Sequence, residues 1–191
     1  MIVVCYITDF LYFCSKVLRV FTIFPNYEEV AKNSRYDSIE ELKLLINTEC
    51  KYEIMKQAFL FSCLCGLRIS DLRKLKWNDL QKSGDRIRIE IKMQKTKEPL
   101  YLPISDEALK WLPLRGEAID SDLIFPLTHE GTINKTLQQW AKAAGVTKHI
   151  SFHTSRHTHA TMMLTLGADL YTVSKLLGHK ISQLPKYMQG L

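Results

Sequence analysis

Two arginine residues stand in short segments that could bind a phosphodiester. Arg68 lies in the segment Cys-Gly-Leu-Arg-Ile-Ser-Asp, and Arg156 lies in the segment His-Thr-Ser-Arg-His-Thr-His-Ala. A guanidinium is planar and permanently charged, so it can donate two parallel N–H bonds to the non-bridging oxygens of a phosphate. Charge grows on those oxygens when a phosphodiester is attacked, and two guanidiniums would stabilise that transition state. The sequence therefore predicts phosphoryl-transfer chemistry at these arginines.

Four further residues could supply proton transfer and a nucleophile. His153 precedes Arg156 by three positions, which places both residues on one face of a helix, where an imidazole can act as an acid or a base. Lys95 is expected in a loop between two strands, from which its ammonium could protonate a leaving oxygen. His179 follows a glycine, and the phenol of Tyr187 near the end of the sequence could act as the nucleophile.

The histidines also raise the question of a metal site. His149, His153 and His157 fall at positions i, i+4 and i+8, which could gather imidazoles on one helix face. No His-Glu-x-x-His pattern accompanies them, and cysteines at metal-binding spacing are absent from the sequence. The sequence therefore favours a site without a metal, and we expect His157 and His159 to be packed structural residues.

The elements that must position these residues are mostly helices. Ser38 and Glu41 form a capping box that opens a helix, and the largely apolar segment from Tyr52 to Leu64 predicts a central core helix that Gly66 can end. Further helical segments are expected over residues 70–75, 106–112, 134–144, 153–166 and 169–177.

One segment alternates β-branched residues with charges, which is typical of a half-buried strand. It runs from Ile87 to Lys92, and Leu100 to Leu102 is expected to pair with it as an antiparallel partner that Pro103 ends. The segment Lys82–Asp85 is expected to be a turn, and Lys95 then lies between the two strands. The predicted fold class is mainly α with a small antiparallel β-sheet, that is, α+β.

The first residues differ from the rest of the chain. Residues 1–24 are apolar, but Asp9, Lys16 and Arg19 interrupt the run, and neither a basic n-region nor a small-residue cleavage site is present. We therefore expect no signal peptide and no membrane span. Residues 1–34 are interpreted as an unassigned segment and linker, followed by one domain over residues 35–191.

Charge and cysteine content indicate the partner and the compartment. Lys and Arg outnumber Asp and Glu by 26 to 20, a net charge of +6 at pH 7, which favours a polyanionic partner without requiring one. The five cysteines are odd in number and lack the density of a disulfide framework. A reducing cytoplasm is therefore the expected location.

Four segments, in this order, resemble the successive signature blocks of the tyrosine recombinases. The resemblance extends from about Ser38 to His179 and is nearest to the integrases of bacterial phages and mobile elements. One block alone would be weak ground, but four in order would not be expected by chance. It implies the fold of a tyrosine recombinase catalytic domain. The blocks are Cys65–Asp71, Gln94–Thr96 followed by Leu102–Ile104, Phe152–Thr161, and Val173–His179.

The resemblance implies a mechanism for the matching positions. Tyr187 would attack the scissile phosphate, which gives a 3′-phosphotyrosyl link and frees a 5′-hydroxyl. Arg68 and Arg156 would stabilise the pentacoordinate phosphorane, and Lys95 would be the general acid for the leaving oxygen. A hydroxyl of a partner strand would then attack the link and rejoin the DNA.

The remaining roles follow from the same resemblance. His153 would assist proton transfer, His179 would hydrogen-bond the phosphate, and Asp71 would support Arg68 or the local turn. No metal, nucleotide or other cofactor is implied. The implied partners are duplex DNA and further copies of the chain, because family members act on DNA as tetramers.

Two features depart from the family's pattern. Tyr187 lies eight positions after His179, one fewer than the usual nine, and Pro185 between them cannot continue a helix. Family members also carry a helical domain that clamps the DNA, and residues 1–34 are too short to form one, so we interpret them as a remnant of such a domain. Two alternatives therefore stay open: an integrase-derived DNA-binding module without catalysis, and a metal-dependent phosphodiesterase that uses the histidines.

Overall fold

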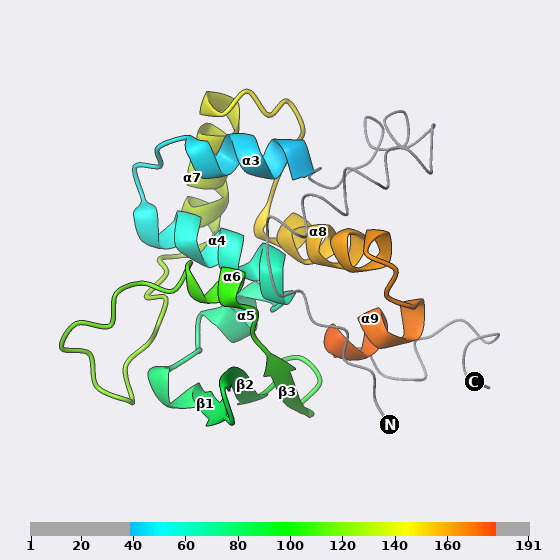
Figure 1. Ribbon diagram of the computed structural model, residues 1–191. Coiled ribbons are helices and arrows are strands. Elements are labelled where there is room, and N and C mark those ends of the chain that lie inside the picture. Colours follow the sequence, from blue (N-terminus) through cyan, green and yellow to red (C-terminus); the bar gives the residue numbers. More distant parts are fainter. Residues whose placement is uncertain (1–38, 179–191) are drawn as a thin grey trace.

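The computed structural model describes residues 39–178 as seven α-helices and one three-stranded antiparallel sheet (Figure 1). The sheet lies at one end of this region, and helices α3 and α7 lie at the other. The predicted class, mainly α with a small antiparallel sheet, is confirmed. In chain order the elements are α3 (Ile39–Asn47), α4 (Glu53–Cys65), α5 (Ile69–Leu72), the 3-10 helix η1 (Trp77–Asp79), β1 (Leu80–Ser83), β2 (Arg86–Lys92), β3 (Pro99–Pro103), α6 (Asp106–Leu109), α7 (Glu130–Ala143), α8 (Phe152–Thr165) and α9 (Leu170–Leu176).

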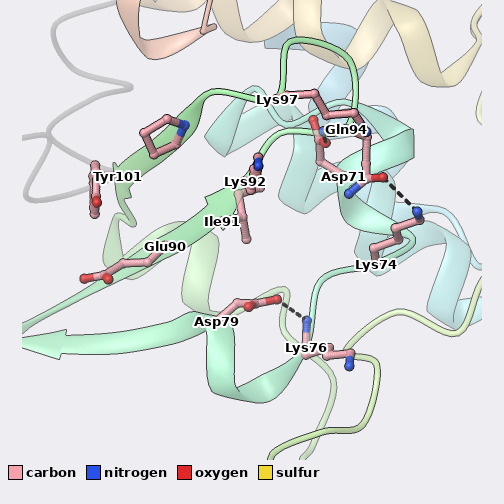
Figure 2. Close-up of a pocket in the computed structure, with 11 residues that line it drawn as sticks. Asp71, Lys74, Lys76, Asp79, Glu90, Ile91, Lys92, Gln94, Lys97 and Tyr101 are labelled. Carbon is pink, nitrogen blue, oxygen red and sulfur yellow. Dashed lines mark hydrogen bonds between the residues drawn. The ribbon is translucent and has the colours of Figure 1, made fainter.

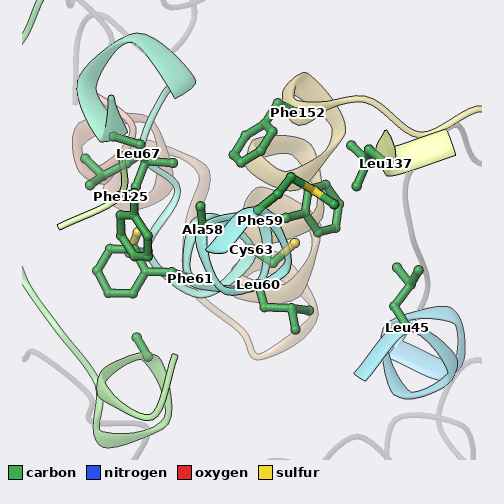
Figure 3. Packing of buried hydrophobic residues seen from close by; sticks show 14 of the residues in the cluster. Leu45, Ala58, Phe59, Leu60, Phe61, Cys63, Leu67, Phe125, Leu137 and Phe152 are labelled. Atoms are coloured by element: carbon green, nitrogen blue, oxygen red, sulfur yellow. The ribbon is translucent and has the colours of Figure 1, made fainter. Parts of the chain in front are cut away.

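Helix α4 is the centre of the hydrophobic core, as its apolar sequence predicts (Figure 3). Phe59 meets Trp140 of α7 edge-on at 6.0 Å between ring centroids, and it meets Phe152 of α8 in the same way at 5.7 Å. Burying a phenylalanine contributes roughly 1.5–3 kcal/mol. One helix therefore joins α7 and α8 in a single core.

Gly66 ends α4 in the left-handed conformation, with φ at 71°, and its N–H donates to the carbonyl of Ser62 at 2.8 Å. A Cβ at this position would lie 2.6 Å from a ring carbon of His159. Glycine is required here both for the backbone conformation and for the close approach of α8.

The sheet has the order β1-β2-β3, so β2 is its central strand. Ile89 of β2 is fully buried, and it pairs with Leu80 on one side and Leu102 on the other. The predicted hairpin of Ile87–Lys92 and Leu100–Leu102 is confirmed as β2 and β3. The prediction missed the third strand, because β1 continues to Ser83 and the turn that was expected at Lys82–Asp85 is limited to Gly84 and Asp85. This edge strand is mostly exposed and has no apolar alternation that could reveal it.

Helix boundaries agree best where glycines and caps mark them. The helix expected at 153–166 is α8, which begins and ends one residue earlier. The helix expected at 169–177 is α9, which is one residue shorter at each end. The helix expected at 106–112 is shorter, since α6 ends at Leu109. Helix α7 begins at Glu130 instead of Asn134, because His129 is its N-cap and accepts a hydrogen bond from Gly131 N–H at 3.3 Å.

The interpretation of residues 1–34 as a separate segment falls outside the described residues and stays a prediction. Across residues 39–178, no helix has the length and apolar character needed to cross a membrane.

Candidate active site

Arg156 lies within α8 and is buried, with 8% of its surface exposed. Its Nη1 donates to the carbonyl of Gly66, after the end of α4, at 2.7 Å, and its Nη2 donates to the carbonyl of Leu177, after the end of α9. Carbonyls at helix C-termini carry partial negative charge and favour a cation. A guanidinium has five N–H donors, so Arg156 keeps donors for a ligand beyond these two bonds.

Arg68 is the residue that precedes α5, and its side chain is half-buried. It follows by two residues Gly66, whose carbonyl accepts the hydrogen bond from Arg156. Burial and, to a smaller extent, the positive charge of Arg68 lower the pKa of Arg156 to about 10, so Arg156 remains cationic near neutral pH. The structure therefore brings the two predicted arginines together, and their mutual repulsion would be relieved by an anion between them.

A buried hydrogen bond between α4 and α8 sets the positions of both arginines. The hydroxyl oxygens of Ser62 and Ser155 lie 2.6 Å apart, and the Ser62 hydroxyl also donates to the carbonyl of Leu67 at 2.9 Å. Ser155 immediately precedes Arg156, and Leu67 immediately precedes Arg68. Ser62 and Ser155 thus fix the backbone next to each of the two arginines.

The loop between β2 and β3 carries Lys95, as predicted, and its side chain is exposed. Asp71 of α5, only 3% exposed, accepts a hydrogen bond from the backbone N–H of Gln94 at 2.7 Å. At the start of the loop, the Met93 sulfur lies 3.5 Å from Nη1 of Arg68. The expected supporting role of Asp71 is therefore directed at the loop that presents Lys95.

His153 lies one turn before His157 on the exposed side of α8, and the Nε2 atoms of the two rings are 2.9 Å apart. Burial lowers the pKa of His157, and the charges of His153 and Arg156 lower it further. His159, by contrast, is buried against Gly66, and burial lowers its pKa to about 4. His159 is thus a packed residue, whereas His157 directly contacts the predicted acid/base residue His153.

The predicted residues His179 and Tyr187 lie outside the described residues. The last described residue is Gly178, whose Cα lies so close to Met93 that any Cβ there would overlap the methionine sulfur. The end of α9 therefore reaches the place where Arg68, Arg156 and the β2–β3 loop meet.

Metal-binding geometry is absent from this region. Among residues 39–178, no three His, Cys, Asp or Glu side chains lie close enough together to hold a metal ion.

The sequence model of the phage integrase family matches residues 33–189, which is most of the length of the chain. The chain belongs to this family. The expectation of a tyrosine recombinase catalytic domain, drawn from the four sequence blocks, is therefore confirmed.

Two relatives show how this integrase-family domain compares in sequence. Tyrosine recombinase XerD of Listeria innocua is 33% identical over 168 residues, which cover 80% of this chain and 55% of XerD. Tyrosine recombinase XerC of Actinobacillus pleuropneumoniae is 32% identical over 124 residues, which cover 60% of this chain and 40% of XerC. The chain spans about half the length of the curated relatives it matches.

Solved structures of the family share the fold. XerA recombinase has a TM-score of 0.61 at 26% identity, covering 75% of this chain and 54% of XerA. The lambda integrase catalytic core has a TM-score of 0.59 at 24% identity, covering 78% of this chain and 96% of that core. A lambda integrase dimer bound to a COC′ core site has a TM-score of 0.60 at 21% identity, covering 81% and 57%. The region common to all of them is the catalytic core of an integrase.

Sequence reasoning missed the contacts that assemble this integrase-family site. Neither the bond from Gln94 to Asp71 nor the contact between Met93 and Arg68 has a signal in the residue pattern. One indication of these contacts was present in the sequence, namely the position of Asp71 shortly after Arg68 and before a charged segment.

Proposed function

We propose that this chain is the catalytic domain of a site-specific DNA recombinase that cuts and rejoins duplex DNA through a 3′-phosphotyrosyl intermediate. The observation that carries the proposal is the hydrogen bond from Arg156 to the carbonyl of Gly66, which ties this arginine to the segment between α4 and α5 that carries Arg68. Such a pair matches the charge that develops on the non-bridging oxygens of an attacked phosphodiester. Membership in the phage integrase family supports it.

In the proposed reaction, the phenol oxygen of Tyr187 forms a bond to phosphorus and the bond from phosphorus to the 5′ oxygen breaks. The tyrosine proton passes to a base, for which His153 on α8 is the proposed residue, and the leaving oxygen takes a proton from Lys95. Attack by a 5′-hydroxyl of a partner strand reverses these steps. The phosphotyrosyl bond conserves the energy of the cut, so rejoining requires no nucleotide.

The proposed partners are duplex DNA and further copies of the chain. A neighbour of the same fold, lambda integrase, has been seen as a DNA-bound dimer, and XerH recombinase has been seen on DNA before and after cleavage. Strand exchange needs two cut duplexes, and this requirement supports the assembly of four protomers on DNA. The proposed location of the reaction is the cytoplasm.

The test is a covalent-adduct assay on duplex DNA taken from both sides of the gene. After denaturation, protein should remain attached to a 3′ DNA end in the unaltered chain and in Tyr171→Phe, whose tyrosine is exposed on α9. The adduct should be lost in Tyr187→Phe and in Arg68→Gln. An adduct that persists in Tyr187→Phe would refute the assignment of the nucleophile.

The rival function, DNA binding without catalysis, gives a different result in the same assay. A folded preparation that binds this DNA but forms no adduct would overturn the recombinase proposal.

A further inference from the structure

A second cationic surface adjoins the loop that carries Lys95. A pocket of about 710 Å³ is bordered by α5, η1, β2, the β2–β3 loop and the start of β3 (Figure 2). Four lysines, Lys74, Lys76, Lys92 and Lys97, surround it, and each of their side chains is exposed. We call these four residues and the space between them the lysine pocket.

The carboxylates that line the lysine pocket are already engaged with other groups. Asp71 accepts its hydrogen bond from the loop backbone, and Asp79 accepts one from the backbone N–H of Lys76 at 2.8 Å. Glu90 pairs with Arg88 at 2.5 Å. Across residues 39–178, no ion pair joins a lysine of the pocket to an acidic side chain. Four lysines and three carboxylates line the pocket, and Glu90 is already paired with Arg88, so the net charge of the pocket is positive.

The backbone of Lys97 gives a second and independent indication. Its φ of 60° lies in the left-handed region, and no other non-glycine residue between 39 and 178 has a positive φ. Glycine or asparagine adopts this conformation more readily than lysine does. The N–H of Lys97 donates to the carbonyl of Met93 at 3.0 Å, so the turn of the β2–β3 loop fixes where this exposed lysine lies at the rim of the pocket.

We propose that the lysine pocket binds backbone phosphates of the DNA strand that continues past the site of Arg68 and Arg156. This inference rests on the proposed function, since DNA is the polyanion that reaches that site. Lys74 donates to the side chain of Gln94 at 2.7 Å, and Lys95 is the next residue, so the pocket begins where the catalytic loop ends. Each DNA strand carries about one charge per 3.4 Å of helix axis, which offers successive phosphates to successive lysines.

The test measures DNA binding and not cleavage. Fluorescence anisotropy with a 30-base-pair duplex at several salt concentrations compares the unaltered chain with the double variant Lys92→Gln/Lys97→Gln. Each lost phosphate contact reduces the slope of log affinity against log salt by about 0.9, so we expect a reduction of about 1.8. The matched control is Lys135→Gln/Lys142→Gln, two exposed lysines of α7 at the opposite end of the structure, and its slope should be unchanged.

Lys97→Gly separates binding from folding. Glycine relieves the left-handed backbone strain, so the melting temperature should be equal to or higher than that of the unaltered chain, while DNA affinity falls. An affinity equal to that of the unaltered chain would contradict a phosphate contact at Lys97.

The outcomes distinguish this inference from the proposed function. An unchanged slope in the Lys92/Lys97 variant, or an equal reduction in the α7 control, overturns the inference even when the covalent adduct forms. A reduced slope supports the inference even when no adduct forms and the recombinase proposal fails. Failure of the unaltered chain to bind duplex DNA overturns both.

Discussion

The Nε2 atoms of His153 and His157 lie 2.9 Å apart on neighbouring turns of α8, so one imidazole donates a hydrogen bond to the other. The bond needs an acceptor nitrogen, and it is lost when both rings are protonated. It also occupies one of the two ring nitrogens of His153, which leaves Nδ1 as the other nitrogen available for proton transfer. The protonation of His157 is therefore coupled to the predicted acid/base residue.

This coupling predicts a change in the titration of His157. Replacement of His153 by asparagine removes one cause that lowers the pKa of His157, so that pKa should rise. It should stay below the ordinary value, because burial, the largest cause, remains. NMR titration of the ring signals checks this, with His149→Asn as a control at an exposed histidine outside the pair. A pKa of His157 that does not move in His153→Asn would contradict the coupling.

The two arginines should differ in their effect on stability. Arg156→Ala removes the donors of two backbone carbonyls, each of which costs about 1–3 kcal/mol when left unsatisfied, so we expect a loss of roughly 2–6 kcal/mol. Arg68→Ala removes a half-buried side chain whose contact is the Met93 sulfur, and it should cost about 1 kcal/mol or less. Urea denaturation measures both values. Equal destabilisation by the two variants would show that the carbonyl bonds of Arg156 contribute nothing.

Two substitutions of Asp71 should separate its hydrogen bond from its charge. Asp71→Asn keeps a side-chain oxygen that can accept from the N–H of Gln94, whereas Asp71→Ala removes the acceptor. Hydrogen exchange at the Gln94 amide should become on the order of 10-fold faster in Asp71→Ala and change little in Asp71→Asn, since a lost bond of about 1.4 kcal/mol is a factor of ten. Equal exchange in both variants would argue against this bond as the support of the loop.

His159 should make the fold sensitive to acid. Its pKa is about 4 in the folded chain and near 6.5 when unfolded, so the unfolded state binds the proton more readily below pH 6.5. The contribution of this group is present above pH 6.5 and is lost as the pH falls toward 4. Between pH 7 and pH 5 the loss is about 2 kcal/mol.

The check for His159 compares free energies of unfolding at pH 7 and pH 5. In His159→Gln the decrease between these values should be smaller by about 2 kcal/mol than in the unaltered chain. NMR of the unaltered chain at pH 5 offers a second measurement, in which the His159 ring should remain neutral. A protonated His159 in folded protein at pH 5 would refute the explanation.

The sequence predicted best what depends on neighbours along the chain. The core helix α4, the glycine after it, and the extents of α8 and α9 to within one residue follow from apolar periodicity and from helix-ending glycines. Strand β1 was missed because it is stabilised by pairing with β2 and not by its own residue pattern. The start of α7 was missed because a histidine caps it, and histidine is not among the usual capping residues.

For the candidate site, residue type and order were enough to select Arg68, Arg156, Lys95 and His153, but not to describe how they are held. The carbonyls that bind Arg156 belong to Gly66 and Leu177, and any residue supplies a carbonyl, so no residue type marks these partners. Contacts of this kind between distant backbone atoms leave no trace in residue identity.

The carbonyl bonds of Arg156 have a consequence for how inactive descendants of such a domain would change over generations. A copy released from selection for recombination but still selected to fold would keep Arg156, because its loss exposes the ends of α4 and α9. Arg68 makes no comparable contribution to folding, because its contact is the Met93 sulfur, so substitutions at this position would accumulate. Within this lineage, therefore, an arginine at position 68 is the better indicator of a competent enzyme, and an arginine at position 156 reports only that the protein still folds.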